Sequence, residues 1–363
     1  MWVSRFFPRI KEFWATHERT LSVVAIVAGF IPDMLALRRV DLLPETILLY
    51  SYLAIIGICI FLIHLTEEGL FRGRMAEAFR PWLSLSLHFT FGSLISALLV
   101  FYSKGGSLWR SWPFLLFLLG IFISLEVFKK YGERIVVQMG MYFFAIFSFC
   151  IFAVPLWLGT IDTSTFLLSG AVSVLVFFLF FFLLSVTGPK RLRGSRVGIL
   201  VSAGLIYLCL NVLYFTNTLP PLPLGLKEIG VYHHVERVNG GYYVQTENAP
   251  WYESFGNPTL HVVPGDTLYV FSSVFTPVAI KTDIVHRWEY FDDTTKKWRQ
   301  VSTIRFPVLG GRDGGYRGFS LQLGISAGKW RVSVETPGGR LIGRISFLVV
   351  AVPALPPLSD LVR

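Results

Sequence analysis

Seven apolar stretches constrain the fold of this chain more than any other feature does. The loops between them are alternately rich and poor in Lys and Arg. The apolar stretches cover residues 21–37, 46–65, 81–102, 111–128, 135–158, 166–186 and 197–215. Each approaches or exceeds the ~20 residues that a helix needs to cross a ~30 Å hydrocarbon core. A segment in lipid must satisfy its own backbone hydrogen bonds, so each stretch is predicted to be a transmembrane helix. Only 15% of the residues are charged, against about 25% in a soluble domain.

The basic residues predict which side of the membrane each loop occupies. Fourteen Lys and Arg residues fall in the N-terminal tail and in the second, fourth and sixth loops, whereas the other three loops hold only Arg38, Arg39, Lys104 and Arg110. Positive residues stay on the cytoplasmic side. We therefore expect a cytoplasmic N-terminus, seven crossings and an exported C-terminal segment.

The chain divides into five predicted parts. Residues 1–20 are expected to form an interfacial amphipathic helix and residues 21–215 the seven-helix transmembrane region. A Pro-rich linker at 216–226, an exported domain at 227–350 and a Pro-rich tail at 351–363 follow, the tail being expected to remain unpaired. All three cysteines lie in apolar stretches, so the exported domain has no disulfide and depends on its core.

Short strand patterns separated by turn residues fill the exported domain. Turns at 239–241, 264–266, 292–297 and 337–339 predict hairpins that join 231–238 to 242–247, 260–263 to 267–275, 279–291 to 298–308, and 329–335 to 340–350. Regular short strands favour an all-β antiparallel sandwich, immunoglobulin-like in outline. The predicted fold is thus an α-helical membrane bundle of seven helices followed by this sandwich.

Polar side chains within the apolar stretches are the first candidates for function in the helical region. They are Asp33, His64, His88, Glu126 and Gln138. The predicted topology puts the last four at similar depths near the cytoplasmic face, where a proton relay or a metal site could form. No ligand spacing such as His-x-x-x-His supports such a site. Interfacial polar residues and hydrogen bonds between helices are the simpler interpretation.

Two loops of the exported domain are candidate ligand-binding sites. The glycine-rich stretch 310–318 carries Arg312, Tyr316 and Arg317, which could meet an anionic or glycan ligand; a flexible loop between strands is the alternative. Trp251 and Tyr252 lie in a second, aromatic loop that could contact a ligand or the bilayer surface. The glycine-rich stretch lacks Gly-Lys-Ser/Thr and precedes no helix, which argues against a phosphate loop.

No catalytic set, metal centre or cofactor site is predicted, and the chain is more consistent with a non-enzyme. The sequence contains no Gly-x-Ser-x-Gly, His-Glu-x-x-His or Cys-x-x-Cys motif. His233 and His234 point to opposite faces of a strand, and His286 shares a face with Trp288, which indicates a hydrogen-bonded core residue. The net charge of +10 lies mostly in the region of the apolar stretches, so the expected partners include the lipid bilayer and exclude nucleic acid.

Several short motifs near the C-terminus recur together in one known family. They are residues 286–288 (His-Arg-Trp), 315–320 (Gly-Tyr-Arg-Gly-Phe-Ser), 328–332 (Gly-Lys-Trp-Arg-Val), 338–343 (Gly-Gly-Arg-Leu-Ile-Gly) and Phe347. This set resembles the bacterial domain-of-unknown-function family 2914, whose domain often follows a multispanning region. The resemblance implies the bacterial inner membrane and a periplasmic domain, and it implies no activity.

Together the sequence favours an integral inner-membrane protein whose periplasmic β-sandwich binds an envelope ligand or a protein partner. The alternative is a small-molecule or lipid transporter that uses the polar residues within the helices. A third hypothesis is a receptor that relays periplasmic binding to a separate cytoplasmic partner.

Overall fold

The chain folds into two compact units, a helical unit followed by a β unit. The computed structural model describes residues 43–105, 118–121, 134–219, 224–238, 240–247, 257–277, 280–309 and 314–363, together with positions 112 and 116. The predicted interfacial helix at 1–20 and the predicted span at 21–37 lie outside these residues, and the span at 111–128 is described at only a few positions.

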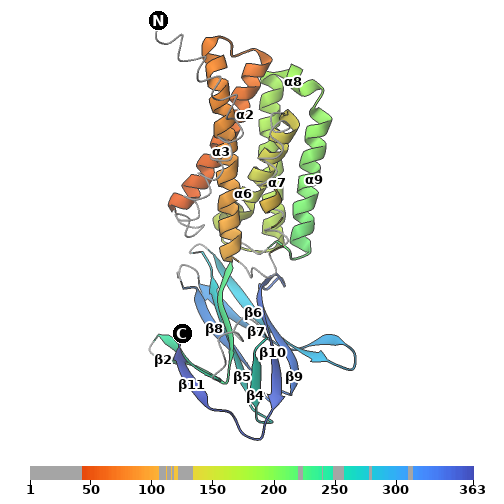
Figure 1. Ribbon diagram of the computed structural model, residues 1–363. Coiled ribbons are helices and arrows are strands. Elements are labelled where there is room, and N and C mark those ends of the chain that lie inside the picture. The colour runs from red at the N-terminus through yellow and green to blue at the C-terminus, as the bar shows by residue number, and fades with distance from the viewer. Residues whose placement is uncertain are drawn as a thin grey trace. The chain divides into compact units, whose positions relative to one another are not determined.

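Long apolar helices form the helical unit (Figure 1). They are α2 (Leu43–Glu68), α3 (Arg74–Gly105), α6 (Ile135–Leu158), α7 (Thr163–Thr187) and α9 (Arg196–Phe215), with the short α8 (Pro189–Arg193) before α9. Each of the five long helices is long and apolar enough to cross a membrane. Five of the seven predicted spans are therefore confirmed as helices of suitable length and composition.

Helix α6 is the most buried of these helices, and aromatic rings pack it against its neighbours. Phe143 lies 5.0 Å from Phe177 of α7, ring centre to ring centre, and Phe147 stacks 5.5 Å from Tyr207 of α9. Most of the residues of α7 and α9 are not buried, and many of the exposed ones are large apolar side chains. An apolar outer surface around an aromatic core suits a lipid environment, because lipid tails make no demand for polar groups.

Eleven strands among the described residues build the β unit. They are β1 (Gly225–Tyr232), β2 (His234–Val238), β3 (Gly241–Glu247), β4 (Thr259–Val262), β5 (Leu268–Phe275), β6 (Lys281–Asp292), β7 (Lys297–Leu309), β8 (Tyr316–Gln322), β9 (Gly328–Glu335), β10 (Leu341–Ala351) and β11 (Leu358–Val362). They form three sheets, with the orders β4-β10-β9-β6-β7, β1-β5-β8 and β11-β3-β2.

The main core lies between the five-stranded sheet and the β1-β5-β8 sheet. Trp288, Val332 and Phe347 from the first sheet pack with Val231 and Val270 from the second, all of them buried. The two-residue period of each strand sends these side chains inward. Most of this core is supplied by strands far apart in the sequence.

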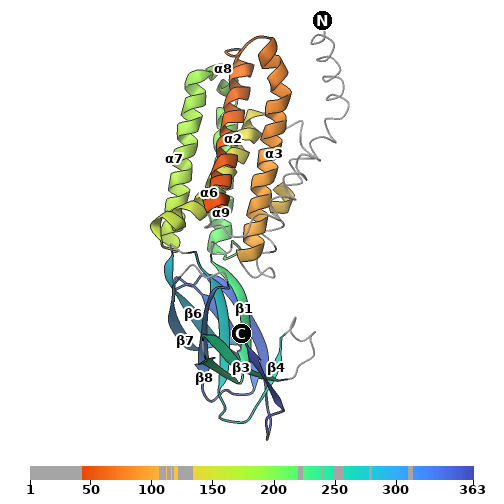
Figure 2. The same cartoon turned by 90° about the vertical axis from the view of Figure 1, so that its left-hand side faces the viewer.

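The β11-β3-β2 sheet, here called the ribbon, covers the other face of the β1-β5-β8 sheet. Tyr242 and Val244 of the ribbon pack with Phe271 of β5 and Phe319 of β8. The β unit is therefore layered, with the small β1-β5-β8 sheet in the middle (Figures 1 and 2).

Three of the predicted hairpins are confirmed and one is wrong. The pairs β2–β3, β6–β7 and β9–β10 are antiparallel neighbours joined by the predicted turns. Strands β4 and β5 do not pair with each other, because the turn between them carries the chain from one sheet to the other. Instead β4 runs parallel to β10, so the β unit is not wholly antiparallel.

The expectation of an unpaired tail is also wrong. Residues 358–362 form β11, which pairs with β3 from Leu358↔Glu247 to Val362↔Tyr243. Prolines at 353, 356 and 357 lie before β11 and leave its backbone N–H groups free to pair.

Candidate functional site

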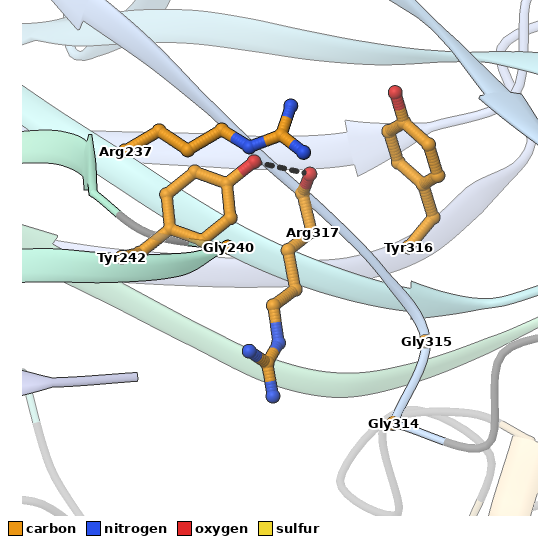
Figure 3. A pocket seen from close by; sticks show the side chains of 7 residues that line it. All are labelled: Arg237, Gly240, Tyr242, Gly314, Gly315, Tyr316 and Arg317. Atoms are coloured by element: carbon orange, nitrogen blue, oxygen red, sulfur yellow. Dashed lines mark hydrogen bonds between the residues drawn. The ribbon is translucent and has the colours of Figure 1, made fainter.

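A cavity of about 230 Å³ lies between the ribbon and β8 (Figure 3). Its lining consists of Arg237, Gly240, Tyr242, Gly314, Gly315, Tyr316 and Arg317. Arg237 is the second-last residue of β2 and Tyr242 the second residue of β3, while Tyr316 and Arg317 open β8. The two turns thus bring together side chains that are about 75 positions apart in the chain.

Two glycines form the backbone edges of this cavity. Gly240 and Gly315 have positive φ, +83° and +81°, which L side chains rarely adopt. A Cβ on Gly315 would stand 2.6 Å from the Ser273 hydroxyl and 2.9 Å from the carbonyl carbon of Val274. The backbone of the glycine-rich stretch can approach β5 this closely only without a side chain.

Tyr242 holds the ribbon against β8. Its hydroxyl donates a 2.9 Å hydrogen bond to the backbone carbonyl of Arg317, drawn as the dashed line in Figure 3. The ring packs with Phe271 at 5.2 Å and with Phe319 at 6.2 Å. The ring of Tyr242 therefore packs the ribbon against β5 and β8, and its hydroxyl ties the ribbon to the start of β8 beside the cavity.

The cavity carries two positive charges, and no Asp or Glu side chain among the described residues pairs with either of them. The exposed Arg237 has neither a hydrogen bond nor an ion pair with a described residue, whereas Arg317 donates a 3.2 Å hydrogen bond to the main-chain oxygen of Arg363, the last residue of the printed sequence. Figure 3 shows the Arg317 side chain extending away from Arg237, with the Tyr242–Arg317 hydrogen bond between them. Guanidinium groups in this state favour phosphate or carboxylate groups as partners.

Of the five candidate residues that the sequence singles out in the C-terminal region, two line this cavity. These are Tyr316 and Arg317. Arg312, Trp251 and Tyr252 lie outside the residues that the structure describes. The sequence analysis missed Arg237 and Tyr242, although both flank the predicted turn at 239–241, which was the signal that could have found them.

In the helical unit, two of the five predicted polar residues lie around Arg191 of α8. Glu67 and the guanidinium of Arg191 form an ion pair, and the Arg191 backbone N–H donates to Glu68. Gln138 accepts a 3.5 Å contact from the same guanidinium. His64 is fully buried, donates to the Leu184 carbonyl at 3.0 Å, and has no partner for its other ring nitrogen.

The other three predicted polar residues do not join this group in the described structure. The ring of His88 bonds to the carbonyl of Ser84 on its own helix at 2.7 Å. Asp33 and Glu126 lie outside the described residues. His64 and Gln138, which were predicted to lie at similar depths, thus both lie near Arg191, a residue that the sequence marked only as one of the basic loop charges.

His286 is a hydrogen-bonded core residue, as predicted. His286 is fully buried, and its two ring nitrogens meet the hydroxyls of Ser272 and Ser320 at 2.8 Å each. Ser320 also accepts the indole N–H of Trp288 at 2.9 Å. Burial lowers the pKa of His286 to about 3, so the ring is neutral at physiological pH.

His233 and His261 meet a single carboxylate. Glu247 at the end of β3 accepts hydrogen bonds from His233 at 2.9 Å and from His261 at 2.7 Å. Burial acts to raise the pKa of Glu247, but these hydrogen bonds outweigh it and hold the pKa below its usual value. Across the described ranges, no three His, Cys, Asp or Glu residues are grouped so that they could hold a metal ion.

Comparison with known proteins gives one family and no activity. Residues 281–349, which run from β6 into β10, match the model of a family described as "Protein of unknown function (DUF2914)". This match confirms the resemblance inferred from the motifs. No curated protein matches the chain significantly.

One similar solved structure is the Pseudomonas fluorescens alkylpurine DNA glycosylase AlkC bound to DNA containing an abasic site analog. The alignment has 12% identity and covers 86% of this chain and 99% of that one, with a TM-score of 0.21. A TM-score this low carries no argument about fold or function.

Proposed function

We propose that this protein is a multispanning bacterial inner-membrane protein whose β unit binds an anionic ligand of the periplasm. The single observation that carries the ligand class is the cavity lined by Arg237 and Arg317, two guanidinium groups that no Asp or Glu side chain neutralises among the described residues. The distribution of Lys and Arg in the sequence supports a cytoplasmic N-terminus and an exported β unit.

The size of the cavity restricts the part of the ligand that enters it. The cavity measures about 230 Å³. Ligand pockets that enclose a whole drug-sized molecule measure about 300–1,000 Å³. We therefore propose that one phosphate- or carboxylate-bearing group enters, while the rest of an envelope molecule or a protein partner stays outside.

We infer further that the two facing sheets are an immunoglobulin-like sandwich to which the ribbon is added. The orders β1-β5-β8 and β10-β9-β6-β7 correspond to strands A-B-E and G-F-C-C′ of that fold. The buried Trp288 lies on β6, where such domains carry their core tryptophan. The ribbon strands β2 and β3 come between β1 and β4, so the proposed site lies where the added ribbon meets β8 of the sandwich.

A titration of the full chain in neutral phosphatidylcholine nanodiscs tests the proposed ligand class. The probes are inorganic phosphate and glucuronate, followed by calorimetry. We expect both anions to bind, and the double variant Arg237→Gln/Arg317→Gln to bind at least tenfold more weakly. The matched control Lys297→Gln/Arg305→Gln removes the same charge from exposed positions on β7 and is expected to bind like the parent.

Two outcomes would contradict the proposal. One is the absence of binding of either anion up to about 10 mM, a concentration that detects even affinities weaker than −4 kcal/mol. The other is equal binding by the double variant and the parent. The charge-keeping pair Arg237→Lys/Arg317→Lys, which retains attraction but loses the bidentate fork, should fall between the two.

A second candidate function is transport by the helical unit, and the cluster of polar and charged residues around Arg191 favours it. Charged residues within apolar helices are costly and commonly serve function. The fully buried His64 with a free ring nitrogen is the residue on which this candidate depends. Uptake measured in proteoliposomes that stays intact in His64→Ala, His88→Ala and Gln138→Ala variants would count heavily against it.

A further inference from the structure

We propose that the end of the helical unit formed by the α2–α3 turn and α8 binds the phosphate of an anionic phospholipid. Figures 1 and 2 both show α8 beside the turn that joins α2 to α3. The proposal rests on the membrane insertion proposed above and is independent of the cavity in the β unit. The surface concerned, here called the basic rim, comprises Arg72, Lys190, Arg193 and Arg196.

The ion pairs beneath the basic rim hold its elements together. Glu67 of α2 pairs with Arg80 of α3 at 3.1 Å and with Arg191 of α8. Glu68 accepts the backbone N–H of Arg191, and the guanidinium of Arg191 reaches Gln138 of α6. Both carboxylates of the α2 end are therefore occupied by Arg80 and Arg191.

The four cations of the basic rim have no partner among the residues that the structure describes. Each is exposed, and none makes a hydrogen bond or an ion pair with another described residue. Gly188 packs so closely that a Cβ would stand 2.3 Å from the Glu68 side chain and 2.5 Å from His64. This close contact places α8, with Lys190 and Arg193, directly against the end of α2.

Exposed aromatic rings flank the same cations. Phe71, Phe79 and Trp82 are 45%, 53% and 53% exposed, and they lie beside Arg72 and Arg80 in the α2–α3 turn and the first turns of α3. Aromatic side chains of this kind occupy the headgroup level of a bilayer. The basic rim therefore lies at the depth of the lipid phosphates.

Charge and depth together define the partner. Unpaired Lys and Arg at the membrane surface attract anionic lipids, and basic pockets between helices bind their headgroups. An attraction of about 1 kcal/mol for each basic residue corresponds to roughly a fivefold gain in affinity. Three such residues acting together would give a preference for anionic over zwitterionic lipid of at least tenfold.

Retention of lipid by the full chain tests this inference. The protein is purified from vesicles of equal phosphatidylglycerol and phosphatidylcholine into a nonionic detergent, and the lipids that remain bound are counted by mass spectrometry. We expect phosphatidylglycerol to be retained at least tenfold over phosphatidylcholine. The variant Arg72→Gln/Lys190→Gln/Arg193→Gln should lose that preference, whereas Lys296→Gln/Lys297→Gln/Arg305→Gln in the β unit should keep it.

Equal retention of the two lipids by the parent chain would overturn the inference, and so would a triple variant that still prefers phosphatidylglycerol. The first outcome is measured on the parent chain, so the proposal can still be refuted if the triple variant fails to fold. Extraction of the chain from vesicles at alkaline pH would instead contradict membrane insertion itself. Loss of anion binding in the β unit would leave the lipid result unaffected.

Discussion

The hydroxyl of Tyr242 donates a 2.9 Å hydrogen bond to the backbone carbonyl of Arg317 and so fastens the ribbon to β8 beside the cavity. One bond therefore joins the two elements that supply the two positive charges. Its geometry makes the relative position of Arg237 and Arg317 depend on ribbon packing.

Replacement of Tyr242 by Phe should loosen this junction. The variant keeps the ring contacts with Phe271 and Phe319 but leaves the carbonyl of Arg317 without its donor, at a cost of about 1–2 kcal/mol. We expect faster hydrogen–deuterium exchange in β3 and β8 of the full chain and several-fold weaker binding of inorganic phosphate. Tyr290→Phe loses only a 3.4 Å exposed contact and should change neither measurement; equal effects of the two variants would contradict the role of Tyr242.

Gly315→Ala should distort the wall of the cavity. The new Cβ would both occupy a residue with φ of +81° and collide with Ser273 and with the backbone of Val274. Gly265 has φ of +96° but open space around its Cβ position, so Gly265→Ala pays only the backbone term of about 1–2 kcal/mol. We expect a larger loss of unfolding free energy for Gly315→Ala in denaturant titrations, and equal losses would show that the close approach is unimportant.

Ser320→Ala should destabilise the core of the β unit. Ser320 is the acceptor for the Trp288 indole and a partner of His286, all of them buried. A buried donor left unsatisfied costs about 1–3 kcal/mol. Exchange of the β6 and β9 amides should accelerate accordingly. The comparison is Ser302→Ala, which removes a less buried bond to Gln322; an equal response from both variants would argue against the buried network.

The stability of the β unit should fall on acidification, because of His286. Burial depresses the pKa of this ring to about 3 from an ordinary 6.5, so between these values the unfolded chain binds a proton that the folded chain excludes. Stability is therefore complete above about pH 6.5 and declines by up to about 1.4 kcal/mol per pH unit toward pH 3.

Hydrogen exchange of β6 and β9 measured from pH 7 to pH 4, after correction for the intrinsic rate, would report this loss. His286→Gln keeps hydrogen-bonding groups but cannot titrate, so its stability should vary less with pH over this range. A variant with the same slope as the parent would place the acid sensitivity elsewhere, for instance at Glu247, whose depressed pKa predicts losses only below its usual range.

The local patterns of the sequence predicted the local parts of the fold. The long apolar runs predicted five helices, α2, α3, α6, α7 and α9. A run of this length and hydropathy can be placed in lipid, where it must form a helix to satisfy its backbone hydrogen bonds. The β6–β7 and β9–β10 hairpins follow from turn residues between adjacent strands. Of the candidate site, Tyr316 and Arg317 were found because a glycine-rich stretch with basic and aromatic residues stands out in one segment.

Contacts between distant segments were not predictable in this way. β4 pairs in parallel with β10, and β11 pairs with β3. Both pairings depend on which sheet edges are free, and the sequence of one strand does not reveal which edges those are. Arg237 and Tyr242 belong to the cavity only because the ribbon packs on β5 and β8. Gln138 meets Arg191 only because α6 packs near α8.

The sequence by itself was enough to predict the apolar helices, the strand-rich C-terminal region and the family that residues 281–349 resemble. Only the tertiary structure decided which basic side chains of the described residues lack an Asp or Glu partner, both in the cavity and at the basic rim. The physical reason is that hydropathy and turn preference act within a few residues of the chain. Neutralisation of a charge depends instead on whatever side chain the packed elements bring within about 4 Å.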